Sequence, residues 1–366
     1  MHSLHMIEYY FVYGINGANL MKYMLSILFA VMVFMGDVAF AQAKSPEQIR
    51  SELPEAYAPY LQKFEDYDVI IESPKDAPEW WAGAPSVVRD TQGIFWMASR
   101  MRTADAPRGL RGYEIRILKS KDGIHFDQVH TIKRENIPIE GFERPVILQD
   151  PQTGKYKLYA CGPWGKNSEW TIIKFDDADS PELFKPNTAK PVIAPRPKTY
   201  ERDIRPDGYK DPTIIFAQGE YHCYVIGTMR RTERIYHYKS KDGDYWEPVG
   251  SYFDSVLDLT SWHDFYVRPA SIVPMEFGYL FFYEGSNVEW YDPVYNMGTG
   301  VAFTFDLHTI QELTTEGPLA VSLTPSKEFH TFRYSHWLRV DDELWCYAEV
   351  VKPNNSHEVR LFRLKK

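Results

Sequence analysis

The sequence predicts an all-β protein, a five-bladed β-propeller with a short helical lead-in at its N-terminus. Aromatic residues make up 15% of the chain, which also contains 25 Pro and 22 Gly, a composition typical of many short strands joined by turns. A strand pattern that begins at a proline recurs at intervals of about sixty residues, which indicates a repeat architecture. One such unit cannot bury both of its faces, whereas five units arranged around an axis can.

Each repeat begins with two adjacent strand patterns, and the second of them is rich in aromatic residues. The prolines that open the first four copies are Pro85, Pro145, Pro212 and Pro269, and the fifth copy lacks the proline. The paired patterns are 84–88 with 94–96, 144–147 with 156–159, 211–215 with 221–224, 268–272 with 279–283, and 334–338 with 344–347.

A third, alternating strand follows in every copy, at 113–118, 170–175, 234–238, 300–305 and 359–364. Asp122-Gly123 and Asp242-Gly243 come directly after two of these strands, and Asp-Gly pairs are strong hairpin signals. Residues 67–72 form one more strand pattern ahead of the first copy. We expect this strand to complete the last blade, so that residues 67–366 form one closed ring.

The N-terminal region is predicted to be an export signal. Lys22 is followed by an apolar run at 24–36 and by small-x-small patterns at 39–41 and 41–43. The run is shorter than the roughly 20 residues that span a bilayer, although a single anchoring helix is the competing interpretation. We therefore expect residues 1–43 to be a signal peptide with an upstream extension, and the mature protein to be periplasmic or secreted. Residues 44–66 form the helical lead-in, with Ser45 as a plausible cap.

Charge and cysteine content narrow the class of function. The net charge is −9 with a pI near 5.7, and the chain lacks the basic run expected of a nucleic-acid-binding protein. Cys161, Cys223 and Cys346 lie in strand-like runs without metal-ligand spacing, so we expect buried free thiols. Nothing in the sequence requires a metal ion or a cofactor.

The starts of the innermost strands converge at one end of the channel of a propeller, so the residues just before each start identify a candidate site. These residues are Gly83 and Ala84, Glu143 and Arg144, Lys210 and Asp211, Val267 and Arg268, and Arg333 and Tyr334. Two carboxylates and three arginines are therefore predicted at one mouth.

The chain resembles the five-bladed propeller glycoside hydrolases, the superfamily of families 43, 32, 68, 117 and 130, over nearly all of residues 67–366. The matching motifs are 142–145 (Phe-Glu-Arg-Pro), 210–212 (Lys-Asp-Pro), and 283–285 (Tyr-Glu-Gly) followed by 295–302. In that superfamily acidic residues in such settings act as base or nucleophile, as transition-state helper and as acid. The chain departs from families 43 and 32 at Gly83-Ala84-Pro85, where they place an essential aspartate.

Glycoside cleavage needs one protonated and one ionised carboxyl group. We expect Glu143 to be the proton donor, with its pKa raised by burial and by a neighbouring carboxylate, and Asp211 to be the base or the group that tunes Glu143. Glu284 is the next candidate. His263 is a candidate imidazole acid or base, because a histidine fills the acid role in family 117. The alternative for the carboxylates is that they lock adjacent blades together.

Substrate binding is assigned to arginines and to ring-bearing side chains. Guanidinium groups match carboxylate or sulfate oxygens, so the arginines predict an acidic sugar, although structural ion pairs explain them equally simply. Indole faces at strand boundaries could stack on pyranose rings or pack in the core. The candidate binding residues are Arg144, Arg205, Arg268, Arg333, Trp81, Trp262 and His336.

The leading interpretation is an exo-acting glycoside hydrolase. It would release a terminal sugar, acidic or anhydro, from an oligosaccharide derived from a plant or algal polysaccharide. A non-catalytic glycan-binding propeller is the first alternative. A polysaccharide lyase is the second, with Tyr266, Tyr334 or His263 abstracting the C5 proton, and a phosphorylase resembling part of family 130 is the third. The sequence leaves the sugar, the linkage and the oligomeric state open.

Overall fold

The computed structural model describes residues 64–196, 205–229, 232–251, 253–287, 297–324, 326 and 329–364. All of them belong to one compact unit, residues 44–366. The expected signal peptide at 1–43 lies outside the described residues, as does the expected lead-in except for 64–66. In the described ranges no helix has the length and apolar character needed to cross a membrane.

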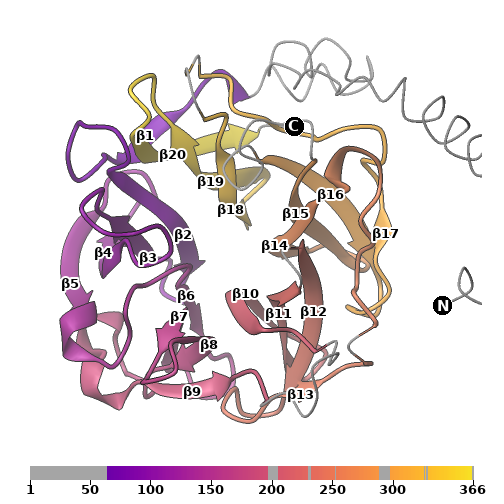
Figure 1. Cartoon of the computed structure of the whole chain (residues 1–366), viewed down its shortest axis with the longest axis horizontal. Coiled ribbons are helices and arrows are strands. Elements are labelled where there is room, and N and C mark those ends of the chain that lie inside the picture. Colours follow the sequence, from indigo (N-terminus) through magenta and orange to yellow (C-terminus); the bar gives the residue numbers. More distant parts are fainter. Residues whose placement is uncertain are drawn as a thin grey trace, which may run out of the picture. The chain divides into compact units, whose positions relative to one another are not determined.

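The described residues form twenty strands, which are grouped into five four-stranded blades around a central axis (Figure 1). Blade one contains β2 (Trp81–Arg89), β3 (Phe95–Arg102), β4 (Gly112–Ser120) and β5 (Asp127–Lys133). Blade two contains β6 (Val146–Gln149), β7 (Tyr156–Trp164), β8 (Glu169–Lys174) and β9 (Lys190–Ile193). Blade three contains β10 (Gly208–Ala217), β11 (Glu220–Met229), β12 (Thr232–Ser240) and β13 (Glu247–Pro248).

Blade four contains β14 (Tyr266–Pro274), β15 (Tyr279–Ser286), β16 (Gly298–Thr304) and β17 (Gln311–Glu312). Blade five contains β18 (Phe332–Val340), β19 (Glu343–Val351), β20 (His357–Leu364) and β1 (Asp68–Ile71). Short 3₁₀ helices are η3 (Arg134–Asn136), η4 (Pro181–Leu183), η5 (Pro186–Thr188) and η6 (Ser261–His263). The sequence-predicted all-β propeller is thus confirmed.

The ring closes through its N-terminal strand. β1 pairs antiparallel with β20, with Asp68 opposite Leu361, so the last blade combines strands from both ends of the described chain (Figure 1). This is the closing strand expected at 67–72. Single parallel bridges also join neighbouring blades, at Trp81 with His357 and at Glu233 with Tyr266.

Apolar side chains fill the spaces between blades. Trp337 of blade five stacks on Phe282 of blade four, with ring centroids 4.1 Å apart and planes 2° apart. Phe64 packs against Trp337 and Phe362 at the same boundary. Burying side chains of this size contributes about 1.5–3 kcal/mol each. The three cysteines are free and buried, as expected.

The innermost strands of blades one, three and five carry a bulge at their site end. Ala84, Asp211 and Tyr334 have φ values of 49°, 51° and 51°, beside a shift in strand register. A left-handed conformation at a residue other than glycine costs about 1–3 kcal/mol. The bulged segments are held by side chains from the second strand of the preceding blade, which accept hydrogen bonds from backbone N–H groups.

These anchoring contacts follow one pattern around the ring. Oε2 of Glu349 accepts a bond of 3.1 Å from the N–H of Ala84, and Sγ of Cys161 accepts one of 3.1 Å from the N–H of Asp211. Oε1 of Glu284 accepts one of 2.8 Å from the N–H of Ser335, next to Tyr334. Each bulge therefore presents its residue to the axis in a defined orientation.

Candidate active site

The axial site is built from three blades that meet at one hydroxyl group. Oη of Tyr334 lies 3.3 Å from Oε2 of Glu143 and 3.3 Å from Oδ2 of Asp211. Glu143 comes from the segment before β6, Asp211 from β10 and Tyr334 from β18. The structure therefore brings together the two carboxylates that the strand starts had singled out, and it adds a tyrosine between them.

Glu143 is surrounded by positive charge. Arg100 makes an ion pair with Oε2 of Glu143, and Nη1 of Arg102 lies 3.7 Å from Oε1. Burial by itself raises the pKa of Glu143, but the charges of Arg100 and Arg102 outweigh burial and hold the pKa below its ordinary value. The expectation of a raised pKa at Glu143 is therefore wrong, because the two arginines of β3 were not counted.

Asp211 makes its closest contacts with neutral groups. The thiol of Cys161 donates to Oδ1 of Asp211 at 3.6 Å, and Oδ2 faces the hydroxyl of Tyr334. Burial raises the pKa of Cys161 well above its ordinary value, so the sulfur keeps its hydrogen and can donate. Asp211 is 2% exposed and Glu143 is 7% exposed, so both carboxyl groups sit at the bottom of the site.

Glu349 of β19 holds the side chains of Arg100 and Arg333 in place. Its fully buried carboxylate accepts hydrogen bonds from Arg100 at 2.7 Å, from Arg333 at 2.9 and 3.0 Å, and from Nδ1 of His357 at 2.7 Å. Although burial opposes ionisation, the two arginines hold the pKa of Glu349 well below its ordinary value. Arg100 is thereby fixed between Glu349 and Glu143.

Glu349 also places its carboxylate beside Gly83 and Ala84, where the first blade has no acidic residue of its own. A Cβ atom added to Gly83 would lie 1.8 Å from Oε2 of Glu349, so only glycine leaves room for this carboxylate. The carboxylate beside Gly83 and Ala84 thus comes from blade five. It binds the guanidinium groups of Arg100 and Arg333, the ring of His357 and the N–H of Ala84, and so holds these groups in place.

A second ion-pair group lies beside the first. Arg268 pairs with Oε2 of Glu233, and Nζ of Lys210 lies 2.7 Å from Oε1 of the same carboxylate. Burial would raise the pKa of Glu233, but Arg268 and Lys210 lower it to about 2. Arg268 is therefore paired with the buried carboxylate of Glu233, and Arg333 with that of Glu349.

Arg144 and His336 line a separate cavity. Arg144 donates to the carbonyl oxygens of Pro269, at 2.7 Å, and of Ala270. Both side chains line a cavity of about 480 Å³ to which all the inner strands of the described ring contribute. Burial, together with the charge of Arg144, lowers the pKa of His336 to about 3. Arg144 and His336 thus line a cavity to which Glu143 and Asp211 do not contribute, and Arg205 is half-buried on the segment that leads to β10.

Glu284 and His263 do not join the carboxyl pair. Glu284 is 1% exposed, its pKa is raised by burial, and it binds the backbone of Ser335, as in the blade-locking alternative. Nε2 of His263 donates to Glu312 at 2.7 Å, within blade four. Trp262 lies next to it and donates from Nε1 to the carbonyl oxygen of Thr314 at 2.7 Å.

Trp81 is fully buried. Its ring is stacked on His357 at a centroid distance of 4.0 Å, and the guanidinium of Arg102 lies 4.4 Å from the ring centroid. The indole therefore has no face open to a sugar, and it supports Arg102 from below instead.

Sequence reasoning missed the residues that set the charge of the site, namely Arg100, Arg102, Glu233 and Glu349. All four lie on second or third strands, away from the strand starts. A signal was present, because Arg100 and Glu349 are charged residues within strands whose other residues are mostly apolar. Charged residues in such strands are seldom buried unless they are paired.

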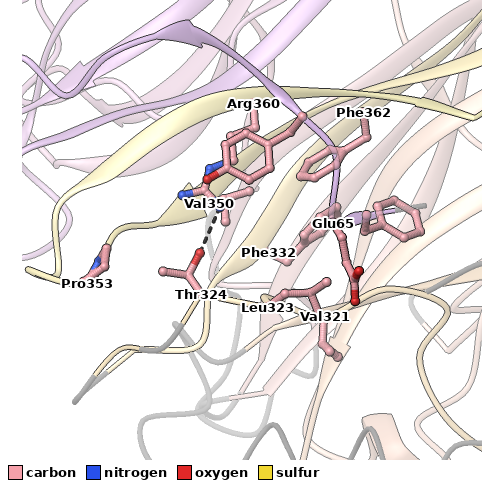
Figure 2. Close-up of a pocket in the computed structure, with 11 residues that line it drawn as sticks. Glu65, Val321, Leu323, Thr324, Phe332, Val350, Pro353, Arg360 and Phe362 are labelled. Carbon is pink, nitrogen blue, oxygen red and sulfur yellow. Dashed lines mark hydrogen bonds between the residues drawn. The ribbon is translucent and has the colours of Figure 1, made fainter. Parts of the chain in front are cut away.

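Two other features of the described residues lack the chemistry of the axial site. In the part of the chain that is described, no group of three or more His, Cys, Asp or Glu side chains could hold a metal ion. Figure 2 shows a pocket of about 410 Å³ near the start of the described chain, where Arg360 donates to Thr324 at 2.9 Å. Its lining is mainly apolar and contains one carboxylate, Glu65, so it lacks the acid pair of the axial site.

Comparison with known proteins supports the fold. The chain is similar to a glycosyl hydrolase from Bacteroides ovatus, with a TM-score of 0.59, 13% identity, and coverage of 88% of this chain and 96% of that one. It is similar to an α-L-arabinofuranosidase from Lactobacillus brevis, with a TM-score of 0.53, 13% identity, and coverage of 77% and 90%.

A third similar structure belongs to the GH130 family of mannoside phosphorylases, described as containing glycoside hydrolases that target β-1,2-mannosidic linkages in Candida mannan. Its TM-score is 0.58 at 14% identity, with coverage of 81% and 93%. No protein-family model and no curated protein matches the chain. At these identities the likeness shows the propeller fold, and the chemistry has to be argued from the site.

Proposed function

We propose that this protein is an exo-acting glycoside hydrolase that releases a terminal acidic sugar from an oligosaccharide. One observation carries the proposal: Glu143 and Asp211, from different blades, approach the same tyrosine hydroxyl at 3.3 Å each. Two carboxyl groups at such close range can supply the acid and the base or nucleophile of glycoside cleavage.

The surroundings of Glu143 and Asp211 indicate which of them acts as the acid and which as the base or nucleophile. Glu143 is paired with Arg100 and faces Arg102, which favours its ionised form, whereas the nearest groups to Asp211 are a thiol and a hydroxyl. We therefore assign Asp211 as the proton donor to the glycosidic oxygen. Glu143 deprotonates the attacking water or attacks the anomeric carbon itself. This reverses the roles expected from the sequence.

The acidic character of the sugar follows from the balance of charge. In the described part of the site, the cations Arg100, Arg102, Arg144, Lys210, Arg268 and Arg333 stand against the carboxylates Glu143, Asp211, Glu233, Glu284 and Glu349. Six cationic groups against five carboxylates leave one positive charge in excess. A uronate or sulfated sugar would balance that excess, since guanidinium forks bind such groups in a bidentate way.

The test is hydrolysis of a panel of oligosaccharides with uronate, sulfated or neutral ends, followed by detection of monosaccharide. Wild-type protein should act on an acidic end. Glu143→Gln and Asp211→Asn should each lose at least a hundredfold in kcat, because general acid–base groups contribute about 10²–10⁴-fold. Asp341→Asn is the matched control, since this exposed residue pairs with Arg89 far from the site. Full activity in both site variants would refute the assignment.

Phosphorolysis is a second candidate, because the same positive excess suits phosphate and the chain resembles a family of mannoside phosphorylases. Turnover that depends on added phosphate would favour it over hydrolysis. Unsaturated, ultraviolet-absorbing products would indicate a lyase. Binding without any product in wild-type protein would indicate the glycan-binding alternative.

A further inference from the structure

The position of Tyr334 suggests more than packing. Its hydroxyl is buried between two carboxyl groups, and its ring is flanked by two guanidinium groups, with Arg100 and Arg333 at 5.3 and 4.8 Å from the ring centroid. The backbone of Tyr334 is left-handed, and Glu284 holds the adjoining N–H group of Ser335. A tyrosine with a strained, anchored backbone and a hydroxyl group close to two carboxyl groups is a candidate for a functional role.

A count of hydrogens restricts how the three groups can bond. A tyrosine hydroxyl has one hydrogen, so it can donate to only one of the two carboxyl groups. Burial and the charges of Asp211 and Glu143 raise the pKa of Tyr334 well above its ordinary value, so this hydrogen stays on the oxygen. The second contact is a hydrogen bond only if that carboxyl group is protonated and donates to the tyrosine oxygen.

Contacts with neighbouring residues decide which carboxyl group holds the proton. Glu143 is paired with Arg100, whereas Oδ1 of Asp211 accepts the thiol hydrogen of Cys161 and leaves Oδ2 for the hydroxyl. The arrangement that satisfies every contact is therefore a chain in which Asp211 donates to Tyr334 and Tyr334 donates to ionised Glu143.

From this geometry we infer that Tyr334 is a proton relay that connects the acid and the base of the active site. The inference rests on the proposed function. In one hydrolytic cycle with Glu143 as the base, Asp211 gives its proton to the leaving oxygen as the glycosidic bond breaks, and Glu143 takes a proton from the water whose oxygen bonds to the anomeric carbon. Glu143 then passes a proton to the oxygen of Tyr334 while Tyr334 passes its own proton to Asp211. The starting state is restored with no net change in protons.

The first test compares Tyr334→Phe with Tyr159→Phe. Tyr159 is a buried tyrosine of β7 whose hydroxyl donates to the carbonyl oxygen of Gly243 at 2.9 Å, so its variant measures the loss of a buried hydroxyl alone. Tyr334→Phe should lower kcat about 10- to 100-fold with little change in KM, because the relay serves proton transfer. Thermal unfolding of both variants checks that the fold is retained.

The pH profile separates a relay from a structural role. Without the hydroxyl, ionised Glu143 loses a hydrogen bond that lowers its pKa, so the acid limb of kcat/KM should move to higher pH. The charged groups that face the trio remain in place in the variant: Arg100, Arg102, Arg144, Lys210, Arg268 and Arg333. An acid limb that does not move, or a profile matching that of Tyr159→Phe, would overturn the relay.

A second measurement does not need turnover. Infrared spectra at the pH of activity should show a carboxylic acid band that is lost in Asp211→Asn, kept in Glu143→Gln and shifted in Tyr334→Phe. The band of Glu284, whose pKa is raised by burial, should be the same in all three variants. The opposite assignment, or a band that does not change in Tyr334→Phe, would reject the inference whatever the activity. If the band behaves as expected and no glycoside is cleaved, the proposed function fails while the hydrogen-bonded chain stands.

Discussion

Replacing Glu349 with glutamine should destabilise the protein strongly. The carboxylate is fully buried and accepts charge-assisted hydrogen bonds from Arg100, Arg333 and His357. Glutamine is nearly the same size, so it creates no cavity, but it removes the negative charge between two buried guanidinium groups. Breaking a buried ion pair from one side costs about 3–5 kcal/mol, because the remaining charge is left uncompensated.

Denaturant unfolding of Glu349→Gln measures this cost. The midpoint should fall with little change in slope, and the melting temperature should fall by about 10 °C, given roughly 2–4 °C per kcal/mol. Asp341→Asn is the control, because this exposed ion pair should contribute at most about 1 kcal/mol. A loss of less than about 1 kcal/mol in Glu349→Gln would refute the view that this carboxylate holds the arginines.

Three further outcomes follow from the same structure. Stability should fall as the pH drops below 6.5. Burial lowers the pKa of His237 to about 2 and of His357 to about 4, so below pH 6.5 these histidines bind protons in the unfolded chain but not in the folded protein. At pH 5 this loss should be about 2 kcal/mol for each histidine, and a flat stability curve between pH 7 and 5 would contradict it. Gly83→Ala should lower stability and activity together, since its Cβ would displace Glu349, and a crystal structure with Glu349 unmoved would contradict that. Ile71→Asp should lower the melting temperature by placing a charge at the buried position of the strand that closes the ring, and an unchanged value would show that closure contributes little.

Much of the fold could be predicted because each blade repeats a local pattern. Strand alternation, the prolines at strand starts and the Asp-Gly turns are short-range signals, and the backbone follows them. In both Ser-Lys-Asp-Gly turns the serine hydroxyl accepts a bond from the glycine N–H, and Gly123 and Gly243 have positive φ. Even the pairing of Asp68–Ile71 with the last blade could be expected, since a ring of repeats leaves one unpaired edge.

Only part of the site could be predicted in the same way. Glu143 and Asp211 lie at strand starts, and rotational symmetry brings such positions to one axis. Arg100 and Glu349 lie within second strands, whose side chains point toward the next blade. Because the partner of each is more than forty residues away, no local pattern shows that Arg100 faces Glu143 or that Glu349 faces Gly83.

The order of strands, the number of repeats and the acids nearest the axis could all be derived from the linear chain, because each depends on spacing along it. Protonation was decided by the tertiary structure alone. The energy of a charge depends on the distance to other charges and on exclusion of water, and both are set by which blades come to lie side by side. For this reason Glu143, expected to hold a proton, is an ionised partner of arginine, and a tyrosine that was considered only for a lyase joins it to Asp211.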